Sequence, residues 1–152
     1  MEVYYHNAAE LHQDGSWFFN HGYKKAWMEY SGIVRLGVDA AKVSVKSKGM
    51  RGESSVYVVE IPQAKILGEP DVDEDSFSEP LTEEGFFTDI TAADKTKMFD
   101  EAQQEMLKTA KADESLLSQA RARAESILEQ YVRGMCEAVG ETNVIVEFED
   151  AK

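Results

Sequence analysis

The amino-acid sequence predicts an α+β fold: a mostly antiparallel sheet, a C-terminal pair of long helices packed on it, and a final strand. Apolar and polar residues alternate over residues 25–38 and 42–48, as in strands with one buried face. Apolar residues then recur every three to four positions over 91–138, and alternation returns over 142–149. Strands that precede a run of helices favour α+β over α/β. The 152 residues suit a single domain spanning 1–152.

The first strands are expected at residues 1–13 and 25–38. The second of these segments has one apolar face at alternate positions. Its members are Met28, Tyr30, Val34, Leu36 and Val38. Gly32 and Gly37 interrupt this strand, and glycines within a strand indicate a bulge or the close approach of another backbone.

A hairpin is expected between residues 42 and 61. Val43 and Val45 alternate with lysines, which predicts a half-exposed strand with a cationic outer face. Residues 49–52 contain two glycines and are expected to connect this strand to a returning strand at 56–61. Pro62 has no amide donor, so strand pairing should end there.

A segment without lysine or arginine lies between Lys65 and Lys95. Its carboxylates include Glu69, Asp71, Asp73, Glu74, Asp75, Glu79, Glu83, Glu84 and Asp89. Pro70, Pro80 and Gly85 interrupt it, so we expect either a long acidic loop or an irregular edge of the sheet. Phe86 and Phe87, near its end, are expected to fold onto the core.

Two helices and a strand are expected at the C-terminal end. Thr91 and Asp94 have the spacing of a capping box, and Asp113 begins a break after which a second helix starts. The stripe expected to be buried consists of Met98, Ala102, Met106, Ala110, Leu116, Ala120, Ala124, Ile127, Leu128, Tyr131 and Met135. Gly140 should end the second helix. The apolar face of the strand at 142–149 consists of Val144, Val146 and Phe148.

The composition limits the classes of function. The formal net charge is −13, which disfavours binding to nucleic acid and to anionic lipid headgroups. The sequence contains no run of 18 apolar residues, the length that a membrane span requires. The single cysteine, Cys136, is expected to be a small buried hydrophobic residue and not a reactive thiol.

The acidic segment contains one candidate metal site. Asp71, Asp73 and Asp75 have the alternate spacing with which calcium loops begin. An EF-hand also requires glycine at the sixth position and glutamate at the twelfth, where this sequence has Ser76 and Thr82. The EF-hand is therefore rejected. A weak, irregular Ca²⁺ site stays open beside the alternative of a solvated acidic loop, and no other cofactor is expected.

No catalytic motif accompanies these acids. The sequence lacks a Gly-x-Ser-x-Gly elbow, a His-Glu-x-x-His pair and a glycine-rich phosphate loop. His6, His12 and His21 lack the spacing and the neighbouring ligands of a usual metal site. A carboxylate- or metal-dependent hydrolase at residues 71–75 is kept as an alternative. A deep pocket that holds these acids beside a histidine would favour it.

Two segments are candidates for contact with another protein or with a second copy of the chain. The cationic side chains are Lys42, Lys46, Lys48 and Arg51. They would suit an acidic partner or the acidic segment of a second copy, and the alternative is charge complementarity within the chain. Trp17 and Phe18 begin an aromatic cluster that belongs either to the core or to an exposed contact patch.

Several segments resemble a single family. They are residues 4–5, 30–39, 61–67, 73–76, 85–87 and 115–120. Over nearly its whole length the sequence resembles the bacterial 4230 family of domains of unknown function. The resemblance implies an N-terminal membrane segment ahead of the domain and an extracytoplasmic location, and the strand-like start at Val3 fits a chain without that anchor. The family has no established activity, so the resemblance implies no catalytic residue.

These observations favour a non-enzymatic binding or scaffold domain of a membrane-anchored, extracytoplasmic bacterial protein. The two alternatives are a hydrolase at the acidic segment and a calcium-stabilised module. Both alternatives depend on where the structure places residues 71–75.

Overall fold

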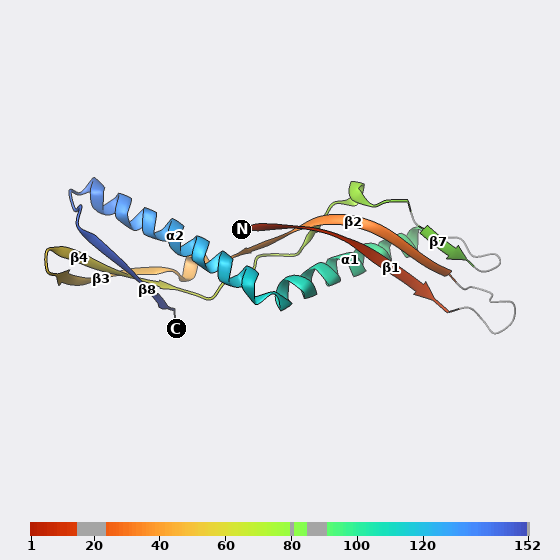
Figure 1. Ribbon diagram of the computed structural model, residues 1–152, viewed down its shortest axis with the longest axis horizontal. Coiled ribbons are helices and arrows are strands. Elements are labelled where there is room, and N and C mark those ends of the chain that lie inside the picture. Colours follow the sequence, from red (N-terminus) through yellow and green to blue (C-terminus); the bar gives the residue numbers. More distant parts are fainter. Residues whose placement is uncertain (15–23, 80, 85–90, 152) are drawn as a thin grey trace. The chain divides into compact units, whose positions relative to one another are not determined.

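The computed structural model describes residues 1–14, 24–79, 81–84 and 91–151. The elements are β1 (Glu2–Gln13), β2 (Lys24–Gly37), the short 3-10 helix η1 (Ala40–Lys42), β3 (Ser44–Arg51), β4 (Ser54–Ile61), β5 (Lys65–Ile66), β6 (Asp71–Val72), the 3-10 helix η2 (Glu74–Ser76), β7 (Leu81–Glu84), α1 (Ala92–Ala112), α2 (Glu114–Ala138) and β8 (Val144–Asp150) (Figure 1). Antiparallel pairing precedes two long helices and a final strand, so the predicted α+β class is confirmed.

The chain divides into two compact units. The hairpin unit consists of Glu2–Arg35 and Gly68–Ala112, and the mixed-sheet unit consists of Met1, Leu36–Leu67 and Asp113–Lys152. Whether these units unfold together as the single domain expected for residues 1–152 stays a prediction.

The hairpin unit is built on β1 and β2. These strands pair antiparallel along the whole of β1, from Glu2 opposite Arg35 to Gln13 opposite Lys24. Met28, Tyr30, Val34 and Leu36 are buried as predicted, and Ala26 is buried with them. α1 packs against the hairpin. Its buried apolar residues are Met98, Ala102, Met106 and Ala110, which confirms the predicted stripe of the first helix.

A capping box starts α1, and a glycine in β2 allows this helix to lie close to the strand. The Asp94 carboxylate accepts hydrogen bonds from the Thr91 amide (2.8 Å) and hydroxyl (2.7 Å), and the Thr91 hydroxyl accepts from the Asp94 amide (3.3 Å). This is the predicted capping box, with aspartate in the place of glutamate. At Gly32 a Cβ atom would lie 2.6 Å from Met106 Cε and 2.8 Å from the Asp71 carbonyl oxygen. The predicted close approach at this glycine is confirmed.

The acidic segment forms an irregular edge along β2, the second of the two predicted alternatives. β6 pairs with β2 at Gly32, and β7 pairs with β2 from Lys24 to Trp27. Between these strands, side-chain hydroxyls replace the missing ladder contacts. The Ser31 amide donates to Ser76 Oγ (2.7 Å), and the Glu29 amide donates to Ser78 Oγ (3.0 Å). The predicted placement of Phe86 and Phe87 lies outside the described residues.

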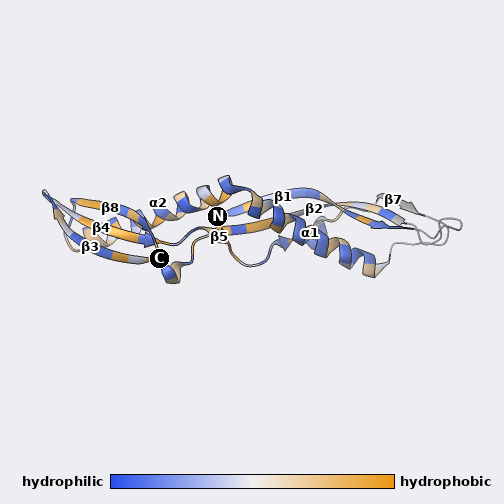
Figure 2. Ribbon diagram, turned by 90° about the horizontal axis from the view of Figure 1, so that it is seen from below, coloured by the Kyte–Doolittle hydropathy of each residue, from blue (hydrophilic) through white to orange (hydrophobic). Residues whose placement is uncertain are grey.

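The mixed-sheet unit contains a three-stranded sheet in the order β3-β4-β8. β3 and β4 are antiparallel, whereas β4 and β8 are parallel. β4 is the most hydrophobic strand of this sheet, whereas β3 is mostly hydrophilic (Figure 2). Val59, Val132, Cys136 and Val144 form the buried cluster between sheet and α2, with Val43, Tyr57, Leu128, Val146 and Phe148 packed against it. The predicted apolar face of the final strand and the predicted burial of Cys136 are thereby confirmed.

The end of α2 follows the predicted glycine stop. Gly140 has a φ of 87°. Its amide donates to the Glu137 carbonyl (3.0 Å), and the Glu141 amide donates to the Cys136 carbonyl (2.9 Å). These two bonds define a Schellman motif, which satisfies carbonyls that the last turn of a helix leaves open.

Two local predictions in the first strands of the mixed-sheet unit were wrong. The turn between β3 and β4 lies at residues 52–53 and not over 49–52. Gly49, with a φ of 87°, belongs to β3 beside a register shift after Ser47, because a positive φ permits a bulge that lets the strand continue. Lys42 lies in η1 and not in a strand, because the Asp39 carboxylate caps that turn by accepting from the Ala41 amide (3.2 Å).

The predicted burial of one side of α2 was also wrong. Ile127, Tyr131 and Met135 are 50%, 70% and 56% exposed. The residues of α2 that meet the sheet are Leu128 and Cys136, which were predicted to be buried, and Val132. Both rows have a spacing of four, so α2 has two adjacent apolar stripes, and the sheet covers only one of them.

Candidate binding groove

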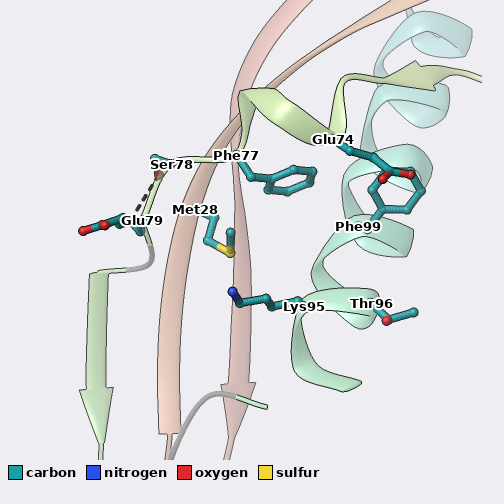
Figure 3. Close-up of a pocket in the computed structure, with 8 residues that line it drawn as sticks. All are labelled: Met28, Glu74, Phe77, Ser78, Glu79, Lys95, Thr96 and Phe99. Atoms are coloured by element: carbon teal, nitrogen blue, oxygen red, sulfur yellow. Dashed lines mark hydrogen bonds between the residues drawn. The ribbon is translucent and has the colours of Figure 1, made fainter. Parts of the chain in front are cut away.

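A groove of about 610 Å³ lies in the hairpin unit between β2, the irregular edge around η2, and α1 (Figure 3). It is lined by Met28, Glu74, Phe77, Ser78, Glu79, Lys95, Thr96 and Phe99. Met28, Phe77 and Phe99 supply the apolar surface. The charged side chains come from opposite sides, because Glu74 and Glu79 belong to the irregular edge and Lys95 to the first turns of α1.

The irregular edge positions Phe77. The Asp73 carboxylate caps η2 by accepting from the Asp75 amide (3.1 Å), and the hydroxyls of Ser76 and Ser78 bond to the β2 backbone on either side of Phe77. Two anchored serines therefore leave the intervening side chain directed into the groove.

Three aromatic rings form a row beneath the groove. The Phe77 centroid lies 6.0 Å from that of Tyr30 and 6.1 Å from that of Phe99, within the range of favourable aromatic pairs. The Tyr30 hydroxyl donates to the Ala102 carbonyl (3.4 Å). Burial raises the pKa of Tyr30 above its ordinary value, and the negative charges of Glu105 and Glu101 raise it further. Tyr30 is therefore a neutral hydrogen-bond donor that links β2 to α1.

The groove has the chemistry of a binding site. Both of its hydroxyls donate to backbone carbonyls: Ser78 to Glu79 (3.3 Å) and Thr96 to Ala92 (3.2 Å). A serine or threonine nucleophile instead needs a neighbouring general base that accepts its proton. An apolar floor with a few charges at its margin is typical of sites that bind apolar groups.

The three aspartates of the predicted metal site each have a separate structural role. Asp71 accepts a hydrogen bond from Arg35 (3.2 Å), Asp73 caps η2, and Asp75 lies within η2. Across the described ranges, no group of three or more histidine, cysteine, aspartate or glutamate side chains is arranged to hold a metal ion. The described residues thus supply no support for the calcium or the hydrolase alternative at residues 71–75.

A cluster that the sequence analysis missed lies across β1 and β2. His6 Nδ1 is 3.1 Å from Ser31 Oγ, and His6 Nε2 is 3.9 Å from the Glu29 carboxylate. Serine, histidine and carboxylate in this order resemble a catalytic triad. The His6 and Glu29 side chains are each 68% exposed, however, whereas a triad acts in an enclosed site with donors for an oxyanion. His6 and Ser31 are therefore a surface hydrogen-bonded pair at opposite positions of β1 and β2, and Glu29 adds a longer, exposed charge contact.

The basic residues of β3 are paired within the mixed-sheet unit. The ion pairs are Lys46–Glu60 (2.6 Å), Lys48–Glu149 (2.6 Å) and Arg51–Glu147 (2.7 Å). By the alternation of strand residues, these pairs lie on the sheet face opposite to the one that α2 covers. Val56 and Val58 on that face are only 3% and 2% exposed, because the long stems of the ion pairs cross the central strand above them.

The predicted interaction face is therefore only partly placed. Lys46, Lys48 and Arg51 lie together on β3, whereas Lys42 lies apart from them in η1. Trp17 and Phe18 lie outside the described residues. A contact of this face with an acidic partner stays a prediction.

Comparison with known proteins gives one match. Residues 1–151 match the family model described as "Protein of unknown function (DUF4230)". No curated protein and no solved structure matches the chain. Neither helix in the described part of the chain has the combination of length and apolar character needed to cross a bilayer. Because the family model covers almost every residue, the chain belongs to the DUF4230 family, as its sequence resemblance indicated.

Proposed function

We propose that this chain is a non-enzymatic binding domain whose ligand is a protein segment with an exposed apolar side chain. The observation that carries this proposal is the composition of the groove between β2, η2 and α1. Met28, Phe77 and Phe99 offer an apolar surface with a volume of about 610 Å³. This volume is within the roughly 300–1,000 Å³ of typical ligand sites.

The charges at the groove specify the ligand further. Glu74 on one side favours a basic residue, and Lys95 on the other side favours an acidic residue, whereas the Glu79 side chain points away from the groove (Figure 3). The ligand is thus an apolar anchor residue flanked by residues of opposite charge, bound in one direction. Apolar anchors in well-packed pockets contribute most of the affinity in such contacts, and charges at the margin set orientation.

The peptide-binding proposal is tested with a library of short peptides that carry an apolar anchor and flanking charges. Lys95→Glu should weaken the selected peptides about tenfold, since one favourable charge pair becomes repulsive. Lys97→Glu is the matched control, because Lys97 is an exposed lysine of the same helix that does not line the groove. Equal weakening by both variants, or cleavage of the peptides, would contradict the proposal.

In the cell, we expect the domain to be tethered to the membrane and to lie outside the cytoplasm. The support for this location is the family resemblance, which implies an N-terminal membrane segment. Protease added to spheroplasts, whose cytoplasmic membrane is intact, should digest the domain of the full-length protein. Digestion only after that membrane is lysed would place the domain in the cytoplasm instead.

A further inference from the structure

Among the described residues of the mixed-sheet unit, no element covers the second apolar stripe of α2. It consists of Ile127, Tyr131, Met135 and Val139, which are 50%, 70%, 56% and 77% exposed. Gly134 and Ala138 lie beside this row and leave a hollow of about 520 Å³. Large side chains next to a hollow floored by small residues allow a second helix to approach closely.

One border of this stripe has a positive charge near one end and a negative charge near the other, so two antiparallel copies of the helix would attract each other. Arg123, Gln130 and Glu137 follow at intervals of seven residues, so they lie on the same side of the helix. Arg123 and Glu137 are both exposed, and within the described residues neither has an ion-pair partner. Two other arginines of α2 are engaged, since Arg121 pairs with Glu125 (2.8 Å) and Arg133 with Glu129 (2.7 Å).

We infer that α2 pairs antiparallel with α2 of a second copy of this chain. A two-fold axis near Gln130 places Arg123 of each copy against Glu137 of the other, which forms two ion pairs. Tyr131 of each copy then lies beside Ile127 of the other, at the centre of the interface. A two-fold interface must be self-complementary, and this stripe meets the condition. A parallel two-fold arrangement would instead place the charged borders of the two helices on opposite sides of the seam, so Arg123 and Glu137 would form no such pairs.

Charge argues against a membrane surface as the occupant of this stripe. An amphipathic helix that binds anionic lipid carries mainly lysine and arginine on its polar face, whereas α2 carries Glu114, Glu125, Glu129 and Glu137 beside its arginines. The whole chain has a net charge of −13. The side chains of a single helical stripe fall short of the roughly 800 Å² per partner in a standard interface. We therefore expect a weak dimer whose population depends on concentration.

Sedimentation velocity of the whole chain over a concentration series tests this inference. Arg123→Glu and Glu137→Arg should each weaken the dimer about tenfold, because one reversal converts two attractive pairs into two repulsive pairs. The double variant that combines both reversals should regain the original dissociation constant. Tyr131→Asp should abolish the dimer, whereas Ser118→Asp, at an exposed position near the start of α2 and away from the stripe and its charged border, should leave it unchanged.

Three results would overturn the inference: a monomer at every concentration, a dimer insensitive to Tyr131→Asp, or single reversals that the double variant does not rescue. Circular dichroism of each variant excludes unfolding as the cause of a change. The peptide groove lies in the hairpin unit and shares no residue with this stripe, so either proposal can fail without the other.

Discussion

Two glycines of this chain lie in opposite steric environments. The Cβ of an alanine at position 32 would lie 2.8 Å from the Asp71 carbonyl oxygen, a backbone atom that cannot rotate aside. Gly32→Ala should therefore lower the free energy of unfolding by about 2 kcal/mol, measured by urea denaturation. Gly134→Ala is the matched control, because nothing lies within 4 Å of its added Cβ and it sits inside α2. It should raise stability by roughly 0.5–1 kcal/mol, and equal effects of the two changes would contradict the close packing at Gly32.

Tyr57 links the pH dependence of stability to one hydrogen bond. Its hydroxyl donates to the Glu141 carboxylate at 2.8 Å, and this bond, with further contributions from Cys136 and burial, raises the pKa of Tyr57 from 10.0 to about 12. A raised folded-state pKa means that the stabilising contribution is complete below pH 10 and is lost as the pH rises towards 12. Between about pH 10 and 12 the free energy of unfolding of Tyr57→Phe should therefore fall less than that of the parent chain. Urea titrations at successive pH values measure this difference. Parallel curves for the two proteins would contradict the prediction.

At the scale of elements, Asp113 separates α1 from α2 and begins the second helix. Its carboxylate accepts hydrogen bonds from the Ser115 hydroxyl (2.7 Å) and from the amides of Ser115 (3.0 Å) and Leu116 (3.2 Å). The Ser115 hydroxyl and the Leu116 amide lower the pKa of Asp113 below its ordinary value. The stabilising contribution is therefore present above the unfolded-state pKa and is lost as the pH falls through the lower folded-state pKa.

Two substitutions at this cap separate hydrogen bonding from charge. Asp113→Asn keeps the acceptor but does not titrate, so its stability should fall less steeply with acid than that of the parent chain. Asp113→Ala removes the acceptor and should destabilise α2 at every pH. Helical circular dichroism during acid titration measures both effects. If the parent chain and Asp113→Asn lose helical circular dichroism over the same acid range, the ionisation of this carboxylate does not contribute to stability.

At the scale of the whole molecule, the two units should respond separately to cavities in their cores. Met98 lies fully buried in the hairpin unit and Val59 in the mixed-sheet unit. Met98→Ala should cost about 3 kcal/mol and Val59→Ala about 2 kcal/mol. Native-state hydrogen exchange should show faster exchange mainly within the unit that carries each change. Faster exchange throughout the chain in both variants would instead support the single cooperative domain expected from the sequence.

Features that depend on neighbouring residues were predictable from the sequence. Thr91 with Asp94, Asp113 and Gly140 are signals that act within one helical turn, and all of them begin or end a helix as expected. The alternation of β2 and β8 was equally informative, because one covered face of a strand selects apolar residues at every second position. The buried stripe of α1 followed for the same reason.

The sequence did not determine how much of α2 is covered. Its apolar residues form two adjacent stripes. Helical periodicity shows in which direction an apolar face points, but not how much of that face another element covers. The sheet meets Leu128, Val132 and Cys136 and leaves Ile127, Tyr131 and Met135 exposed. The strand pairings of the acidic segment were likewise beyond prediction, since the hydroxyls of Ser76 and Ser78 replace backbone contacts that no short-range pattern encodes.

The candidate site shows the same division between local and long-range information. Asp71, Asp73 and Asp75 have a metal-like spacing in the sequence, but Arg35 and the η2 backbone engage Asp71 and Asp73 separately. The groove instead unites Met28, Phe77 and Phe99, which no sequence spacing relates. The sequence by itself determined the class of fold, the helix caps and most buried faces, because these depend on interactions over a few residues. Only the tertiary structure decided which apolar groups remain accessible, because accessibility depends on what distant segments cover.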